Sequence, residues 1–192
     1  MSNFKQGVQA VTPASSTTER IKKPKSYTST FSHEDSATLQ IEMQAIGVVH
    51  SSYLERFSTP RQATLDTPKA AQIHLNKGYN FEQAVQDLSG FSHIWVVYWM
   101  HLNKGWNPTV VPPRGPKIRR GLFSTRAPHR PNSIGLSAVR LKKINGRVLH
   151  IEGHDMLDGT PVLDIKPYIP YADTIADASS GWLDEIGLVD PV

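Results

Sequence analysis

Proline and glycine interrupt this sequence so often that a long helix has no room in it. Fourteen prolines and 13 glycines are spread over 192 residues, and both residue types end helices and mark turns. Between them stand short runs rich in β-branched and aromatic residues, of which the most apolar is Ile94–Met100, and such runs favour buried strands. Short strands at this spacing predict a mainly β fold, either a barrel or a sandwich of mixed sheet, with a few short helices.

The expected strands follow from alternation and from these apolar runs. They cover residues 39–49, 70–75, 91–101, 122–125, 134–141, 147–153 and 161–165, with a turn at Asp158-Gly159 before the last. Residues 81–88 predict one short helix, with Asn80 as its N-cap and the apolar side chains on one face. Four prolines between Asn103 and Arg120 exclude regular structure there.

Composition divides the chain into three parts. Residues 1–40 are rich in Ser, Thr, Lys and Pro and have little apolar surface to bury, so we expect a disordered arm. Residues 41–172 form the expected domain. Residues 173–192 form an acidic tail, and we expect Trp182 to dock this tail on the domain. No stretch is apolar for long enough to span a membrane, and the absence of cysteine is compatible with the cytoplasm we expect. A Ser/Thr-rich, mildly basic N-terminus leaves a transit peptide open.

Charge is segregated along the sequence. No acidic residue occurs between Leu88 and Ile151, whereas 11 of the 21 basic residues lie between His101 and His150. From Glu152 onward nine acids face a single lysine, Lys166. One basic surface of this kind attracts a nucleic acid or a phosphorylated ligand, although a solvated basic face without a partner is also compatible with it.

Several common site types are excluded or weak. No two glycines lie two positions apart, which removes the G-x-G-x-x-G pattern of Rossmann folds, and neither the P-loop pattern nor the G-x-S-x-G elbow occurs. His150, Glu152, His154 and Asp155 superficially suggest a metal site, but a third converging ligand is not evident. Satisfied or exposed histidines are the commoner explanation, and we expect no metal.

Two polar segments are candidates for a binding site. The turn at residues 123–137 carries Arg126, His129 and Arg130 and is stiffened by Pro128 and Pro131. Arginines held on a stiff turn can bind carboxylate or phosphate groups. An ordinary basic turn is the alternative. The segment after Asp155 offers carboxylates to an amine, a ribose hydroxyl or a sulfonium, but its Asp164 can equally pair with Lys166.

Five motifs in order make these segments specific. They are Pro60-Arg-Gln, Phe91-Ser-His-Ile-Trp, Pro112-Pro-Arg, Ser124-Thr-Arg-x-Pro-His-Arg-Pro-Asn-x-Ile-Gly-Leu-Ser and Asp158-Gly-Thr-Pro-Val-Leu-Asp-Ile-Lys-Pro-Tyr. The series resembles the TsaA-like family, also called YaeB or TrmO, from about Ile41 to Tyr171. Ser133 departs from it, because the family usually has proline there.

The resemblance implies a small single-sheet β-barrel that dimerises and binds S-adenosylmethionine without a Rossmann fold. It implies methylation of N6 of threonylcarbamoyl-adenosine beside the anticodon of tRNA. The implied cofactor residues are Pro60, Arg61, Gln62, Met100, His101, Arg126, Leu136, Asp155, Met156, Leu157 and Asp158. The extra C-terminal domain with which some members are thought to hold tRNA has no counterpart in the sequence.

For such a reaction the sequence offers three candidate bases, His101, His129 and Asp155, and does not choose among them. The expected contacts with phosphates of the anticodon stem are Arg114, Lys117, Arg119, Arg120 and Arg130. Three other functions remain open: methylation of another RNA or a small molecule, a non-catalytic module that binds S-adenosylmethionine or RNA, and a metal-dependent hydrolase.

Overall fold

The computed structural model describes residues 39–56, 58–63, 68–113 and 115–187. Contacts separate the residues from 42 onward from those before them, and the two parts are treated as separate units. Every helix and strand that the structure describes lies in the second unit. The arm expected over residues 1–40 falls almost wholly outside the described residues, as do residues 188–192 of the expected tail.

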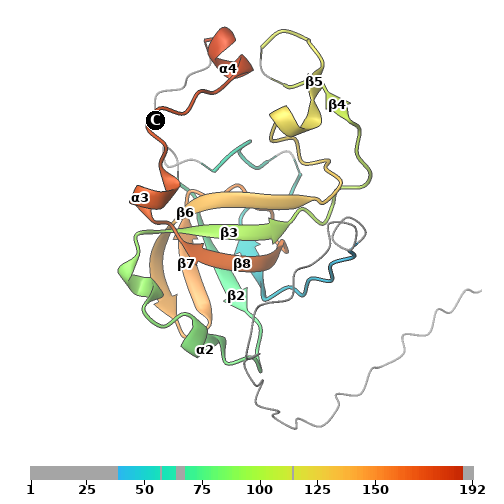
Figure 1. Ribbon diagram of the computed structural model, residues 1–192. Helices are drawn as coiled ribbons and strands as arrows, with labels where there is room; N and C mark the ends of the chain where they lie inside the picture. The colour runs from blue at the N-terminus through green and yellow to red at the C-terminus, as the bar shows by residue number, and fades with distance from the viewer. Residues whose placement is uncertain (1–38, 57, 64–67, 114, 188–192) are drawn as a thin grey trace, which may run out of the picture. The chain divides into compact units, whose positions relative to one another are not determined.

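A closed barrel of six strands forms the centre of this unit (Figure 1). Its strands, in barrel order, are β1 Gly47–Ser51, β2 Ala70–Leu75, β7 Val148–Glu152, β6 Ile134–Asn145, β3 His93–Trp99 and β8 Pro161–Pro167. The predicted barrel is therefore confirmed. The expectation of a mixed sheet is wrong, because every neighbouring pair is antiparallel.

Alternation along the strands explains the core. Each barrel strand points successive side chains alternately inward and outward, and the inward positions carry apolar residues. Fully buried among them are Val49, Ile73, Ile94, Val96, Val139, Leu149 and Val162. The run that we expected to form a buried strand is indeed β3, at the centre of this core.

Three local expectations are wrong, each for a physical reason. The helix over 81–88 shortens to α2 Phe81–Ala84, followed by the 3-10 turn η1 Leu88–Gly90, because Asp87 adopts a left-handed φ of 65°. Asn80 is the N-cap residue of α2 as predicted, but the expected capping by its side chain is absent, and its amide donates to Oε1 of Gln83 instead. Residues 122–124 form a 3-10 turn, η2, because the hydroxyls of Ser124 and Thr125 donate to nearby backbone carbonyls.

Two further segments differ from expectation. Residues 39–46 carry the predicted alternation but form no strand, and the side chain of Met43 is largely exposed. The proline-rich stretch contains a small two-stranded ribbon, β4 Thr109–Val110 paired with β5 Arg120–Gly121. Prolines 112, 113 and 116 all lie in the loop between these strands, where no ladder hydrogen bond is lost.

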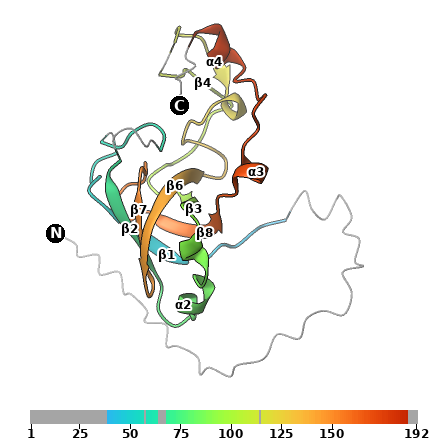
Figure 2. The same cartoon turned by 90° about the vertical axis from the view of Figure 1, so that its left-hand side faces the viewer.

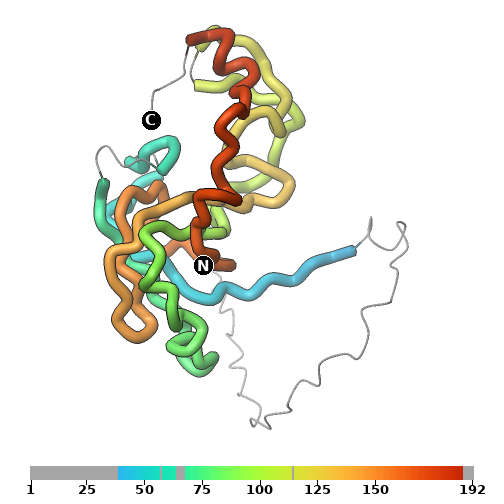
Figure 3. The backbone as a smooth tube through the Cα atoms, turned by 60° about the vertical axis from the view of Figure 1, so that its left-hand side comes forward, coloured from blue at the N-terminus to red at the C-terminus, as the bar shows by residue number. Residues whose placement is uncertain are grey.

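After the barrel the chain continues through α3 Pro170–Asp173 to α4 Trp182–Glu185. Figures 1 and 2 show α4 beside β4 and β5, on the side of the barrel away from α2, and in Figure 3 the red C-terminal tube runs up to the yellow-green ribbon. The indole Nε1 of Trp182 donates to the carbonyl of Ser124 at 2.8 Å, which confirms the expected docking. None of the described helices is long and apolar enough to cross a bilayer.

Candidate functional site

Strand direction brings the predicted site residues to one end of the barrel. Because neighbouring strands are antiparallel, the C-terminal ends of β1, β3 and β7 meet the N-terminal ends of β2, β6 and β8 at one rim. The loops at this rim, here called the loop rim, carry residues 60–62, 100–101, 126 and 155–158, and Leu136 is the third residue of β6. Segments almost a hundred residues apart in sequence therefore share one end of the barrel.

Side-chain hydrogen bonds tie three of these loops together. Arg126 donates through Nη1 to Oε1 of Gln62 at 3.4 Å, which joins the Pro60-Arg-Gln loop to the proline-rich turn. Arg56 Nη2 lies 2.5 Å from Oδ1 of Asn103 and 2.8 Å from Nε2 of His129. Nδ2 of Asn103 in turn donates to the carbonyl of Pro128 at 3.4 Å. We call Arg56, Asn103 and His129 the loop clasp. No signal in the sequence pointed to Arg56, because it is a single arginine in a loop and belongs to none of the five motifs.

The clasp fixes the tautomer of His129. A guanidinium group only donates hydrogen bonds, so Nε2 of His129 must accept from Arg56. The ring proton of the neutral imidazole then lies on Nδ1. In this arrangement Nε2 is occupied and cannot take a proton from a substrate.

Asp155 belongs to a polar cluster at the end of the barrel interior. Its Oδ1 accepts from the hydroxyl of Ser137 at 2.6 Å and from that of Tyr98 at 3.4 Å. The Tyr98 ring fits only because position 135 is glycine, since a Cβ there would lie 2.2 Å from the ring. Burial and the charge of Asp155 raise the pKa of Tyr98, so the phenol stays protonated and donates. Both partners of Asp155 are buried, and they hold one of its oxygens in place.

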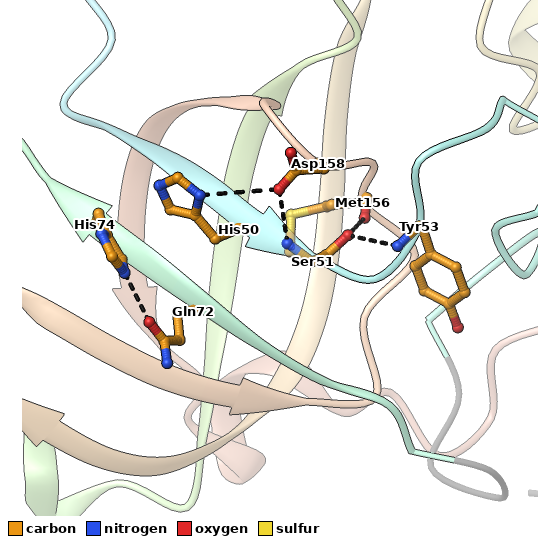
Figure 4. Close-up of polar contacts among 7 residues, drawn as sticks. All are labelled: His50, Ser51, Tyr53, Gln72, His74, Met156 and Asp158. Carbon is orange, nitrogen blue, oxygen red and sulfur yellow. Dashed lines mark hydrogen bonds and ion pairs between the residues drawn. The ribbon is translucent and has the colours of Figure 1, made fainter.

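The segment at residues 156–158 is fastened to β1, as Figure 4 shows. Oδ1 of Asp158 accepts from the backbone N–H of Ser51 at 3.0 Å and lies 3.9 Å from Nδ1 of His50. The hydroxyl of Ser51 donates to the carbonyl of Met156, whose side chain is 1% exposed and packs in the core. The expected turn at Asp158-Gly159 is confirmed, with a φ of 75° at the glycine.

Met156 and its neighbour His154 are internal supports of this segment. The backbone N–H of Met156 donates to Nδ1 of His154, so both backbone groups of Met156 are already hydrogen bonded. His154 is 1% exposed, and burial lowers its pKa. Within the described part of the chain its Nε2 has no hydrogen-bond partner.

A hollow of about 630 Å³ lies on the outer side of β1, β2 and β7 next to the loop rim. Its charged and imidazole lining consists of His50, Lys142, Lys143, His150, Glu152 and Asp158. Lys142 is paired with Glu152 at 3.3 Å, and the His50 ring packs 4.2 Å from that of His74. Despite these imidazoles, no group of three potential metal ligands is found among the described residues.

The five expected phosphate contacts have different environments. Lys117 and Arg119 are exposed on the ribbon loop. Arg120 pairs with Glu185 of α4 at 3.5 Å, and its guanidinium lies 5.2 Å from the Trp182 ring. Arg130 donates to the carbonyls of Leu122 and Thr125, and Arg114 lies outside the described residues.

Residues 48–174 match the family model of the tRNA-methyltransferase O N-terminal domain. The chain belongs to this family. It is 43% identical over 148 residues to the tRNA (adenine(37)-N6)-methyltransferase of Escherichia coli K12, an alignment that covers 73% of this chain and 63% of that protein. It is 42% identical over 137 residues to a probable S-adenosyl-L-methionine-binding protein of Methanothermobacter thermautotrophicus, covering 71% of this chain and 96% of that one.

The fold agrees with a solved member of the family. The crystal structure of TrmO from Pseudomonas aeruginosa superposes with a TM-score of 0.65 at 38% identity. That alignment covers 76% of this chain and 64% of the solved one. The chain thus spans slightly less than two thirds of the E. coli relative and of this solved structure, whereas it matches nearly the whole archaeal relative.

Proposed function

We propose that this protein binds S-adenosylmethionine at the loop rim and methylates N6 of threonylcarbamoyl-adenosine next to the anticodon of tRNA. The observation that carries the proposal is that one end of the barrel collects the loops of three of the family motifs, those that begin at Pro60, Ser124 and Asp158. The name of the E. coli relative supports the reaction, and that of the archaeal relative supports the cofactor.

The residues at the rim fit such a cofactor. Arg126 and Gln62 are both exposed and keep further donors and acceptors beyond their mutual hydrogen bond. The carboxylates of Asp155 and Asp158 provide the negative charge that an amino group or a sulfonium requires, and the largely exposed side chain of Leu136 offers an apolar surface. Pro60, Arg61, Met100, His101 and Leu157 would complete the site. We infer that Met156 acts from within, by holding the segment to β1.

The cofactor supplies a methyl group on a positively charged sulfur, which leaves with its electron pair when the methyl is transferred. The chain's own contribution is to position the acceptor nitrogen and to remove its proton. His129 accepts a hydrogen bond from Arg56 through Nε2, and Asp155 uses one oxygen for Tyr98 and Ser137. His101 is exposed at the end of β3, and we propose it as the base.

We propose that Lys117 and Arg119, together with Arg114, contact phosphates of the anticodon stem. Arg120 would contribute once Glu185 moves away. Arg130 would shape the turn, because its hydrogen bonds to two carbonyls already engage its guanidinium. A homodimer and a cytoplasmic location belong to the same proposal, and analytical ultracentrifugation tests the first.

The reaction is tested by incubating the purified protein and S-adenosylmethionine with total tRNA from a strain that lacks the corresponding gene. We expect one methylated nucleoside, N6-methyl-threonylcarbamoyl-adenosine, by mass spectrometry after digestion. His101→Gln should reduce its rate by about 10²- to 10⁴-fold, while the matched variant His93→Gln, on the far end of β3, should retain it. Methylation of a different nucleoside would identify another acceptor, and cofactor binding without any transfer would contradict the enzyme assignment.

A further inference from the structure

A second hollow, of about 430 Å³, opens beside the loop clasp. It is lined by Lys104, Gly105, Trp106 and Asn107 on one side and by His129 on the other. The first four residues connect the end of β3 to β4, so they lie between the loop rim and the ribbon. None of them except His129 was singled out for a binding role from the sequence motifs.

Trp106 is the unusual member of this lining. Half of its surface is exposed to solvent. This exposure is unfavourable, because burial of the apolar indole would stabilise the folded protein. Exposed aromatic rings beside basic side chains are typical of surfaces on which unpaired nucleobases stack. Lys104 lies two residues away, and no acid occurs in the sequence from Leu88 to Ile151.

The two sides of this hollow are held together. Arg56 contacts both Asn103, next to Lys104, and His129 on the opposite side. Asn103 also donates to the carbonyl of Pro128, the residue before His129. A surface fixed by such cross-loop hydrogen bonds loses little conformational freedom when a ligand binds. The clasp therefore preorganises the hollow, whose lining begins at Lys104, three residues along the chain from the candidate base His101.

We propose that this hollow receives the acceptor nucleobase of the RNA, stacked on the indole of Trp106. Lys104 would contact the phosphate of that nucleotide, and the amide of Asn107 would hydrogen-bond the edge of the base. The acceptor must leave its own stack to expose N6, and the aromatic face of Trp106 replaces the interaction that it gives up. This assignment rests on the proposed function, because it names the acceptor subsite of that same reaction.

The test is the affinity of the full chain for a synthetic anticodon stem-loop RNA, measured over a series of salt concentrations. Trp106→Ala should weaken binding by about 5- to 150-fold, the range found for loss of one aromatic stack. Trp106→Phe, which keeps an aromatic face, should stay within about 3-fold of the unmodified protein. Because stacking displaces no counterions, Trp106→Ala should leave the salt slope unchanged, whereas Lys117→Ala should reduce it by about 1.

A second RNA locates the stacked base. When the acceptor adenosine is replaced by an abasic site, Trp106→Ala should change the affinity by less than about 2-fold, because the partner of the indole is already absent. The affinity of Trp106→Ala for S-adenosylmethionine should equal that of the unmodified protein, which confirms an intact fold and cofactor site.

Four results would overturn the proposal. They are an unchanged affinity of Trp106→Ala, an equal loss for Trp106→Ala and Trp106→Phe, a salt slope altered by Trp106→Ala, and an undiminished effect on the abasic RNA. An altered oligomeric state of Trp106→Ala, with RNA affinity retained, would assign Trp106 to a protein interface. RNA binding can depend on Trp106 as predicted while the unmodified protein transfers no methyl group. In that case the proposed function fails, and the nucleobase subsite at Trp106 stands.

Discussion

The barrel and the ribbon with its docked C-terminal segment are held together by different forces. Val49, Ile73 and Ile94 are completely buried between strands that pair along much of their length. The ribbon has only two paired positions, and its partner α4 contacts it through the Arg120–Glu185 ion pair, the Trp182 indole and an apolar contact of Ile186 at Gly115. One region depends on apolar burial, the other on a few largely exposed polar contacts.

This difference matches what each region has to do. The proposed cofactor site draws on the three connections β1–β2, β3–β6 and β7–β8. Such a site needs a scaffold that fixes the ends of its loops, and a closed barrel has no free edge along which strands can shift. A surface that binds RNA phosphates needs charge rather than rigidity, and weak internal contacts leave its arginines able to exchange partners. We therefore expect substitutions to separate into two groups.

The largest expected effect is in the barrel core. Ile94→Ala removes a fully buried side chain and leaves a cavity between strands, so the free energy of unfolding should fall by about 2–5 kcal/mol. The matched change on the ribbon loop, Ile118→Ala at a side chain that is 49% exposed, should change it by no more than about 0.5 kcal/mol. Urea titration of both variants measures the difference, and equal losses would contradict the division into scaffold and surface.

The next effect depends on pH and lies at the end of the barrel. Burial lowers the pKa of His154 in the folded protein below the ordinary value of 6.5, so below that pH the unfolded chain binds more protons. The contribution of His154 to the free energy of unfolding should therefore be complete above about pH 6.5. As the pH decreases below this value, the free energy of unfolding should fall by at most about 1.4 kcal/mol per pH unit for this one proton.

His154→Asn should flatten this part of the stability profile, measured by urea titration between pH 7 and 5. His101→Asn, at an exposed position, serves as the control and should leave the slope unchanged. A slope that persists in His154→Asn would mean that another group is responsible.

The smallest expected effect is at the contact between ribbon and C-terminal segment. Glu185→Gln breaks the pair with Arg120, but the Glu185 side chain is 68% exposed, so the stability should change by less than about 1 kcal/mol. The freed guanidinium should bind a phosphate, so the affinity for tRNA should rise by a few fold. The dependence of this affinity on salt concentration should become steeper by about one released counterion. Weaker tRNA binding would show that Glu185 holds Arg120 in its binding position.

The sequence predicted a mainly β fold because its buried strands carry alternation or an apolar run, as in Ile94–Met100 and β6. The choice of a barrel over a sandwich came from the family resemblance. It did not predict where β1 begins, because alternation over residues 39–46 indicates an apolar face but does not show whether a partner covers it. The 3-10 turn at Leu122–Ser124 was missed because two hydroxyls satisfy the backbone locally, which residue propensity does not reveal.

The candidate site was predictable in its motifs but not in its contacts. The resemblance named the loops, and strand direction explains why they meet. The pairing of Arg126 with Gln62 and the clasp of Arg56, Asn103 and His129 join residues that are 25 to 73 positions apart, and nothing in a single sequence reports such distances. Likewise, the engagement of Arg120 and Arg130 within the protein depends on partners that only the folded chain brings near.

The most direct test of the central claim, that the loop rim binds S-adenosylmethionine, is calorimetric titration of the purified protein with this ligand. Arg126→Ala removes the guanidinium that joins two loops of the rim, and Arg140→Ala removes an exposed arginine from the middle of β6. We predict saturable binding by the unmodified protein and by Arg140→Ala, and its loss or marked weakening in Arg126→Ala. Equal affinity in all three proteins, or no binding by the folded unmodified chain, would contradict the account.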